Sequence, residues 1–347
     1  MLYQPVTIKS ITEAVSGFKI FVFEDGHGIH CQAGQYLTFI HPREGDELRR
    51  SYSILSAPLL HEPLAIGVRR IDNGAFSRWL TDHAMPGSQL LTTGAAGFFT
   101  LPGDLQPYQQ VFFFAAGSGI TPIYSLLKTI LYLHPQLHVV LIYSNSSPEH
   151  TILYQELIQL RELFHHRFRL QFIFSNARNL RHAHLNRERL VEILEEHLTT
   201  TPRQALFYTC GPEAYMRMCT YTLQEEKVPT QNIRREHFTS VKKTIAVTPP
   251  DRATQAVSIM YGGEEYSFTV AYPDSILQAA KKEGIRLPYS CEAGRCGNCA
   301  ARLLKGNVWL SYNEVLTEKE LEEGLTLTCV GHPVGGDVAL SIDALKQ

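Results

Sequence analysis

The sequence lacks any apolar run of about 18 residues, the minimum expected of a helix that crosses a membrane, so it predicts no integral membrane segment. It also lacks a strong excess of charge. Its 32 basic and 34 acidic residues give a net charge of -2, which argues against the basic surface of a nucleic-acid-binding protein. The first ten residues have neither the basic start nor the apolar core of an export signal, so we expect a cytoplasmic protein.

Cysteine is scarce as well, with seven residues in a chain of 347. Four of them form a pattern: Cys291, Cys296 and Cys299 have the spacing C-x4-C-x2-C, and Cys329 follows after 29 intervening residues. This is the plant-type ferredoxin spacing, in which four thiolates hold a 2Fe-2S cluster. Gly294 falls inside the loop, where a residue without a Cβ can take a positive φ and let backbone N–H groups approach the sulfurs.

A zinc site and a disulfide framework are the alternatives for these cysteines. Structural zinc sites usually arrange their ligands as two close pairs, and no second pair is present. Disulfides are uncommon in a large chain without an export signal. The remaining cysteines, Cys31, Cys210 and Cys219, are odd in number, which fits a reducing compartment. We therefore predict that the four patterned cysteines hold a 2Fe-2S cluster.

The hydrophobic pattern changes along the chain and predicts several domains. Residues 1–104 contain short alternating runs such as Phe18–Phe23, Tyr36–Ile40 and Leu64–Arg69, which indicate a small antiparallel β-barrel. Residues 105–238 alternate apolar strands with amphipathic helices, which indicates an α/β domain with a parallel sheet. Residues 239–253 are rich in charge and proline and are expected to form a linker. Residues 254–347 carry the cysteine pattern.

The α/β domain begins with a strand, a glycine loop and a helix. The apolar run Val111–Ala115 leads into Gly117-Ser118-Gly119, and a helical spacing of apolar residues starts at Ile120 with Pro122 in its first turn. This order is the context that a phosphate-binding turn requires. Three further strands are expected, at Val139–Tyr143, Arg169–Phe174 and Ala205–Thr209.

Several short motifs resemble those of ferredoxin-NADP reductase-like flavoproteins. They are Gly34-Gln35-Tyr36, Arg50-Ser51-Tyr52-Ser53, Gly74-Ala75-Phe76-Ser77, Gly97-Phe98, the G-x-G-x-x-P form of Gly117, Gly119, Thr121 and Pro122, Cys210-Gly211-Pro212, and Glu236-His237-Phe238. The C-terminal part resembles a β-grasp ferredoxin with an α+β fold. The resemblance covers nearly the whole chain and is nearest to oxygenase reductase components of the phenylacetyl-CoA epoxidase type.

The resemblance implies a flavin site in the barrel. Arg50 would pair with the flavin phosphate, Tyr52 would stack on the isoalloxazine ring, and Ser53 would hydrogen-bond near the ring nitrogen that receives hydride. The turn Gly74–Ser77 opens a helix and presents N–H groups to an anion, so we assign it to the flavin pyrophosphate. A pyrophosphate site favours FAD over FMN.

The resemblance also implies how the nicotinamide nucleotide is held. The loop containing Gly117 and Gly119 would bind it, and Cys210 would lie beside the reacting nicotinamide carbon, although a buried core cysteine is the plain alternative. Glu236 and Phe238 would lie against the flavin. We expect NADH rather than NADPH, because Ser144–Ser147 has no arginine for a 2′-phosphate. Arg178 and Arg181 keep NADPH open as the alternative.

These modules together predict an electron relay. The resemblance implies an oxidoreductase that takes hydride from NAD(P)H onto FAD and passes single electrons through the cluster to an oxygenase, hydroxylase or desaturase protein. The residues alone leave two alternative functions open. One is a stand-alone quinone or dye reductase, and the other is a non-catalytic redox sensor whose cluster reports to a binding partner.

Overall fold

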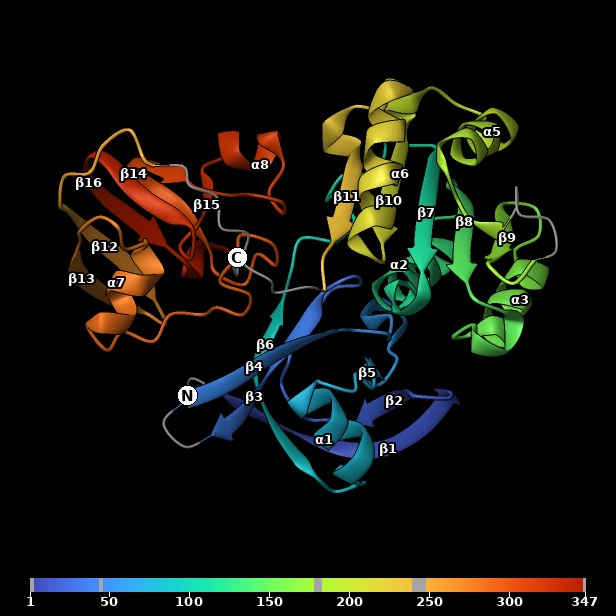
Figure 1. Ribbon diagram of the computed structural model, residues 1–347, viewed down its shortest axis with the longest axis horizontal. Helices are drawn as coiled ribbons and strands as arrows, with labels where there is room; N and C mark the ends of the chain where they lie inside the picture. The colour runs from blue at the N-terminus through green and yellow to red at the C-terminus, as the bar shows by residue number, and fades with distance from the viewer. Residues whose placement is uncertain (1–2, 44–45, 178–182, 239–247, 346–347) are drawn as a thin grey trace. The chain divides into compact units, whose positions relative to one another are not determined.

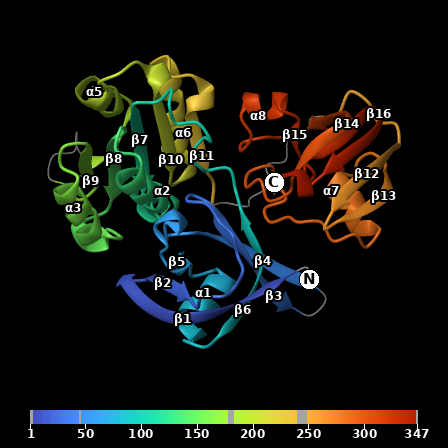
Figure 2. The ribbon, with the colours of Figure 1, turned by 180° about the vertical axis from the view of Figure 1, so that it is seen from behind.

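A computed structural model describes residues 3–43, 46–177, 183–238 and 248–345 of the chain. The chain divides into two compact units, residues 1–236 and 237–347, and both are drawn in Figures 1 and 2. The first unit holds the predicted barrel and α/β domain, and the second holds the predicted ferredoxin domain. The finer boundaries at residues 104 and 253 stay predictions, and residues 239–247 of the predicted linker lie outside the described residues.

Six antiparallel strands form the N-terminal barrel in the spatial order β4-β3-β6-β1-β2-β5. They are β1 (Gln4–Val15), β2 (Phe18–Phe23), β3 (Tyr36–Arg43), β4 (Asp46–Ser53), β5 (Ala65–Arg69) and β6 (Gln89–Ala96). A bridge between Ile54 and Ile66 joins the ends of this order and closes the sheet. Helix α1 (Ala75–His83) buries Phe76 and Leu80 in the barrel core. The antiparallel fold predicted from the alternating runs is confirmed.

Five parallel strands form the second sheet, in the order β11-β10-β7-β8-β9. The strands are β7 (Gln110–Ala116), β8 (His138–Asn145), β9 (Phe168–Phe174), β10 (Ala205–Cys210) and β11 (Ile233–Glu236), and the helices are α2 (Ile120–Leu133), α3 (Tyr154–Leu163), α5 (Arg187–His197) and α6 (Glu213–Glu225). Every strand that the apolar runs predicted is present, as is the helix that begins at Ile120.

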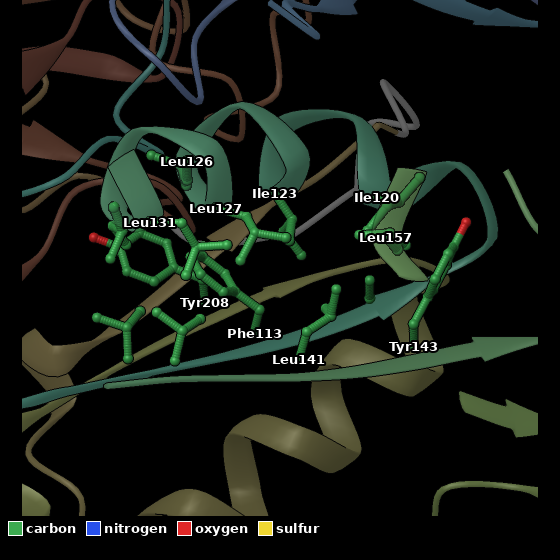
Figure 3. Packing of buried hydrophobic residues seen from close by; sticks show 14 of the residues in the cluster. Phe113, Ile120, Ile123, Leu126, Leu127, Leu131, Leu141, Tyr143, Leu157 and Tyr208 are labelled. Carbon is green, nitrogen blue, oxygen red and sulfur yellow. The ribbon is translucent and has the colours of Figure 1, made fainter. Parts of the chain in front are cut away.

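Helices cover both faces of this sheet. Figure 3 shows Ile123 and Leu127 of α2 pointing toward Phe113 and Leu141 on one face. The neighbouring residue Phe112 points the other way and packs with α5 and α6. Successive residues of a strand face opposite sides of a sheet, so a continuous apolar run is what a strand covered on both faces requires.

The strand order changes direction between β7 and β10. Strands β8 and β9 extend the sheet on one side of β7, while β10 and β11 extend it on the other. In parallel α/β sheets, ligands bind at the carboxyl ends of the strands at such a switch point. The glycine loop follows β7 and Cys210-Gly211-Pro212 follows β10, so the two motifs lie side by side at this point.

The second unit is a mixed five-stranded sheet with the order β13-β12-β16-β14-β15. Its elements are β12 (Gln255–Tyr261), β13 (Glu264–Val270), α7 (Ile276–Lys282), β14 (Ala300–Leu310), α8 (Glu318–Glu322), β15 (Leu325–Leu327) and β16 (Gly331–Ser341). The loop from Cys291 to Cys299, here called the cluster loop, lies between α7 and β14. Cys329 lies between β15 and β16.

Within the described ranges, no helix combines the length and the apolar character that crossing a membrane requires.

Candidate functional site

Strand β4 presents the three residues of the R-x-Y-S motif in different environments. Arg50 is exposed, and its Nη1 donates to the carbonyl of Arg49 at 2.7 Å. Tyr52 is half-buried, with its ring centroid 6.1 Å from that of Phe76. Burial raises the pKa of Tyr52, so its hydroxyl stays neutral. Ser53 is buried at the carboxyl end of the strand.

The turn before α1 has no room for a side chain at its glycine. A Cβ on Gly74 would lie 2.4 Å from the Ser77 Oγ. That hydroxyl donates to the carbonyl of Gly74 at 3.2 Å and accepts from the N–H of Ile71 at 3.3 Å. Gly74 is the N-cap and no side chain caps the helix. The backbone N–H groups of Ala75, Phe76 and Ser77 belong to the first turn of α1. They therefore lie at the point assigned to the flavin pyrophosphate.

The glycine loop after β7 is held by hydroxyl groups. Gly117 has a φ of +53°, a backbone conformation that favours glycine. Its carbonyl accepts from the Tyr143 hydroxyl at 2.9 Å. Thr121, which is followed by Pro122 in the first turn of α2, donates from Oγ1 to the carbonyl of Ser118 at 2.8 Å. These contacts fix the loop that the sequence assigns to the nicotinamide nucleotide.

The two nucleotide motifs pack against each other without space for a methyl group. A Cβ on Gly119 would lie 2.1 Å from the carbonyl oxygen of Cys210. A Cβ on Gly211 would lie 2.8 Å from the Cβ of Ala116. The glycine loop and Cys210-Gly211-Pro212 thus form one continuous surface at the switch point of the sheet.

Three of the residues that the resemblance places near the reacting rings meet beside this surface. Cys210 is in register with Glu236 of β11, and its Sγ lies 3.5 Å from the Glu236 carbonyl oxygen. The Glu236 side chain reaches the barrel, where the Ser53 hydroxyl lies 3.3 Å from both carboxyl oxygens. The chain therefore joins residues of the flavin barrel and of the nucleotide sheet in a single buried cluster.

Burial controls the charge of this cluster. It raises the pKa of Glu236 to about 8, and the hydrogen bond from Ser53 only partly opposes this change. Burial, and then the nearby Glu236, also raises the pKa of the Cys210 thiol well above its usual value. At neutral pH the Glu236 carboxyl and the Cys210 thiol therefore both keep their protons and carry no charge.

The remaining sequence predictions for this region stay predictions. Phe238 lies in the second unit with 49% of its surface exposed. Arg178 and Arg181 lie outside the described residues, so the structure says nothing of their reach toward a nucleotide phosphate.

The four patterned cysteines come together in the second unit. The thiol of Cys291 contacts that of Cys296, and the thiol of Cys299 contacts that of Cys329. The N–H of Ala293 donates to the Cys291 Sγ at 3.4 Å. Hydrogen bonds from the Cys296 thiol and from backbone N–H groups lower the pKa of Cys291 to about 6. Four convergent thiols with N–H donors are the donor set that a 2Fe-2S cluster needs.

A second segment, residues 311–316, runs beside the cluster loop. The N–H of Glu314 donates to the carbonyl of Gly294 at 3.0 Å, and the N–H of Ser311 donates to the carbonyl of Val330 at 3.0 Å. A Cβ on Gly294 would lie 2.7 Å from the carbonyl oxygen of Tyr312. The segment therefore contacts the cluster loop and the residue that follows Cys329.

Two features of the site were missed by sequence reasoning. The Ser53–Glu236 hydrogen bond joins residues 183 positions apart. The sequence around either residue does not indicate that the other is its partner. A second missed feature is a buried ion pair in which the Arg295 Nε lies 2.9 Å from the Glu314 Oε2. An arginine inside a cysteine loop is a signal that could have raised the question of its counter-ion.

Three protein families match successive parts of the chain. An oxidoreductase FAD-binding domain matches residues 5–101, an oxidoreductase NAD-binding domain matches residues 113–220, and a 2Fe-2S iron-sulfur cluster binding domain matches residues 259–334. These matches confirm the predicted cofactors FAD, a nicotinamide nucleotide and a 2Fe-2S cluster, in the predicted order.

Longer similarities cover nearly the whole chain. The sequence is 31% identical to one of the subunits of 1,2-phenylacetyl-CoA epoxidase from Escherichia coli (strain K12), over 90% of this chain and 88% of that protein. It is 30% identical to the ferredoxin reductase component of 3-ketosteroid-9-alpha-monooxygenase from Mycobacterium tuberculosis, over 89% and 85%. The solved structure of phthalate dioxygenase reductase shares the fold, with a TM-score of 0.59, 22% identity and 98% coverage of both chains.

Proposed function

Because this chain belongs to the family of oxygenase reductase components that join an FAD-binding, an NAD-binding and a 2Fe-2S domain, we propose that it carries electrons from NADH to a terminal oxygenase. The names of the relatives support an oxygenase system as the acceptor, since they include a monooxygenase and an epoxidase. A hydroxylase or desaturase protein would use the same electrons.

One observation carries this proposal: Ser53 of the barrel, Cys210 of β10 and Glu236 of β11 meet in one buried cluster. A hydride donor and a flavin must lie face to face with water excluded, and a junction between a flavin barrel and a nucleotide sheet meets that requirement. A binding protein without hydride transfer has no need for this junction.

The flavin would be held by residues of the barrel. Arg50 supplies a guanidinium for phosphate oxygens, and the turn Gly74–Ser77 supplies backbone N–H groups at the start of α1. The half-buried Tyr52 ring offers a flat apolar surface for the isoalloxazine. When bound, FAD accepts the two electrons of a hydride and releases them one at a time, which is the chemistry that a one-electron cluster requires.

Glu236 would hold a proton in the site. Its raised pKa keeps the carboxyl neutral at pH 7, so no negative charge faces the place where hydride arrives. A neutral carboxyl both donates and accepts, so Ser53 and Glu236 can exchange donor and acceptor roles along their 3.3 Å contact. Cys210 lies behind them and presents a neutral thiol.

Cys291, Cys296, Cys299 and Cys329 would hold the cluster. Thiolates are the ligands that iron–sulfur clusters require, and the backbone N–H groups of the loop stabilise the negative charge on the sulfurs. NADH is preferred in this proposal, because the segment Ser144–Ser147, which begins at the end of β8, carries no cation for a 2′-phosphate.

The experiment is an anaerobic visible spectrum of the purified protein before and after one equivalent of NADH, and separately of NADPH. We expect flavin and iron–sulfur bands that both bleach, faster with NADH. Bleaching of the flavin alone would remove the single-electron step from the proposal. A sensor without catalysis would reduce cytochrome c negligibly when NADH is supplied in excess, which would overturn the proposal entirely.

A stand-alone dye reductase is the remaining candidate, and it differs in where the electrons leave. In the proposed function, cytochrome c reduction depends on the cluster, whereas reduction of ferricyanide by the flavin does not. If a cluster-free preparation still reduces cytochrome c at the full rate, the cluster is not the exit and the dye reductase is favoured.

A further inference from the structure

Arg295 lies inside the cluster loop, immediately before Cys296, and is almost completely buried. Its guanidinium Nε lies 2.9 Å from the Glu314 Oε2, with side-chain exposures of 1% for the arginine and 17% for the glutamate. Arg295 also places its guanidinium 5.7 Å from the centre of the Tyr312 ring and its Nη2 3.5 Å from the Tyr312 hydroxyl. A charged side chain this deeply buried is rare unless it is paired.

The glutamate of this pair has two further contacts. Its backbone N–H donates to the carbonyl of Gly294 in the cluster loop at 3.0 Å. The His237 Nε2 lies 3.8 Å from the same Oε2 atom that contacts Arg295. The carboxylate therefore cannot move away from the cluster loop without breaking several contacts at once.

From this geometry we propose that Arg295 and Glu314 form a charge pair that sets the reduction potential of the 2Fe-2S cluster. One-electron reduction adds a negative charge to the cluster, so a nearby cation stabilises the reduced form and a nearby anion destabilises it. In the buried pair the two charges largely cancel. Loss of either partner leaves the other charge uncompensated in a region that solvent screens poorly.

The two single variants therefore shift the potential in opposite directions. Glu314→Gln keeps the shape of the side chain and leaves Arg295 uncompensated, which raises the potential. Arg295→Met keeps an unbranched side chain without the charge and leaves Glu314 uncompensated, which lowers it. The double variant restores a neutral pair and returns the potential toward that of the wild type. His237 is unchanged in all of these variants, so its contribution is common to them.

A purely structural role gives a different result. If the pair only braced the loop, both single variants would loosen the same contacts and shift the potential in the same direction, and the double variant would add to the damage. The opposite signs, together with recovery in the double variant, thus separate an electrostatic role from a structural one.

The measurement is an anaerobic redox titration of the full-length protein, followed by the electron paramagnetic resonance signal of the reduced cluster. The matched control is Glu323→Gln, which removes the same charge from the exposed pair Lys319–Glu323, whose side chains are 74% and 51% exposed. We expect no shift for this control. Arg295→Lys, which keeps the positive charge, should stay near the wild-type potential. If Arg295→Met loses its cluster, Arg295→Gln replaces it, because this variant also removes the positive charge.

The inference rests on the proposed assignment of the cluster to this loop, and the titration distinguishes the two. A wild-type protein without a cluster signal contradicts the proposed function. A wild-type protein with the signal, whose Glu314→Gln variant shows an unchanged or lowered potential, contradicts the role proposed for the Arg295–Glu314 pair.

Discussion

At the scale of single residues, Glu236 makes stability depend on pH. Its pKa is about 8 in the folded protein against an ordinary 4.5. The folded state therefore holds a proton that the unfolded state releases, so stability is fully present below about pH 4.5 and falls as the pH rises toward 8. The expected loss is about 1.4 kcal/mol per pH unit within that window.

The variant Glu236→Gln tests this dependence because it cannot ionise. The free energies of unfolding of this variant and of the wild type are measured by urea titration. We expect the variant's value relative to that of the wild type to increase as the pH rises through this window, and to stay constant above it. Ser53→Ala serves as a comparison, since it keeps the titrating carboxyl. A difference between Glu236→Gln and wild type that stays constant with pH would show that the carboxyl is ionised in the fold.

Gly119 gives a second test at this scale. Replacement by alanine would place a Cβ 2.1 Å from the Cys210 carbonyl oxygen, so the backbone of one motif must move. We expect Gly119→Ala to weaken NADH binding by at least about tenfold, which corresponds to about 1.4 kcal/mol, while the flavin spectrum is retained. Stopped-flow reduction at increasing NADH concentration measures this effect.

Gly117→Ala is the matched control for this substitution. Gly117 has a positive φ, but no atom lies within 4 Å of the position that a Cβ would take there, so alanine costs only about 1 kcal/mol of backbone strain. Equal losses of NADH affinity in both variants would mean that strain in the loop, and not its contact with Cys210, determines nucleotide binding.

Residue-level prediction from the sequence succeeded where a motif is local and stopped where a contact is distant. Three of the four patterned cysteines lie within nine consecutive residues, and the glycine loop is equally short, so a 2Fe-2S cluster and a nicotinamide nucleotide could be inferred directly. The contact between Ser53 and Glu236 depends on how two domains fold together. Neither hydrophobic periodicity nor spacing encodes such a contact, so the sequence alone could not predict it.

At the scale of elements, a partly buried ion pair connects α2 to the barrel. The Lys128 ammonium of α2 contacts the Glu62 carboxylate, with side-chain exposures of 10% and 32%. Glu62 also accepts from the N–H of Ala57 at 2.7 Å, and Ser125 donates to the carbonyl of Ser56. Because α2 starts at the glycine loop, these contacts link the barrel to the helix that follows the proposed nucleotide-binding loop.

We expect Lys128→Met to destabilise the protein by about 1–3 kcal/mol, because it leaves Glu62 without its cation in a partly buried position. Urea unfolding measures the loss, and the double variant Lys128→Met with Glu62→Gln should recover part of it. The control is Arg187→Met at the exposed pair Arg187–Glu225, where both side chains are more than half exposed and the cost should stay below about 1 kcal/mol. A larger loss for the control would contradict this account.

At the scale of the whole molecule, the two compact units divide the chemistry between them. Apart from His237 and Phe238, the flavin and nucleotide motifs lie in the first unit, and the four patterned cysteines lie in the second. The order of the motifs along the sequence predicted the order of the cofactors, whereas the domain bounds at residues 104 and 253 stay predictions. The bounds of short strands such as β15 could not be predicted, because three residues carry no periodicity.

This division predicts that reduction of the flavin by NADH and electron transfer through the cluster can be lost independently. In Cys329→Ser the cluster loses one thiolate, so we expect NADH to bleach the flavin at an unchanged rate while reduction of cytochrome c is largely lost. Visible spectra and a cytochrome c assay on the same preparation measure both steps. Cys31→Ser is the control and should affect neither. Loss of flavin reduction in Cys329→Ser would show that the units do not act independently.

Gly119 and Gly211 also constrain how this sequence can change over evolutionary time. Gly119 faces the main chain of Cys210 and Gly211, whereas Gly211 faces the Cβ and the main chain of Ala116, the residue before the glycine loop. A smaller neighbouring side chain therefore cannot compensate for an alanine at Gly119. We expect related sequences to keep both glycines together, and lineages that have lost one of them to have lost nicotinamide-dependent reduction as well.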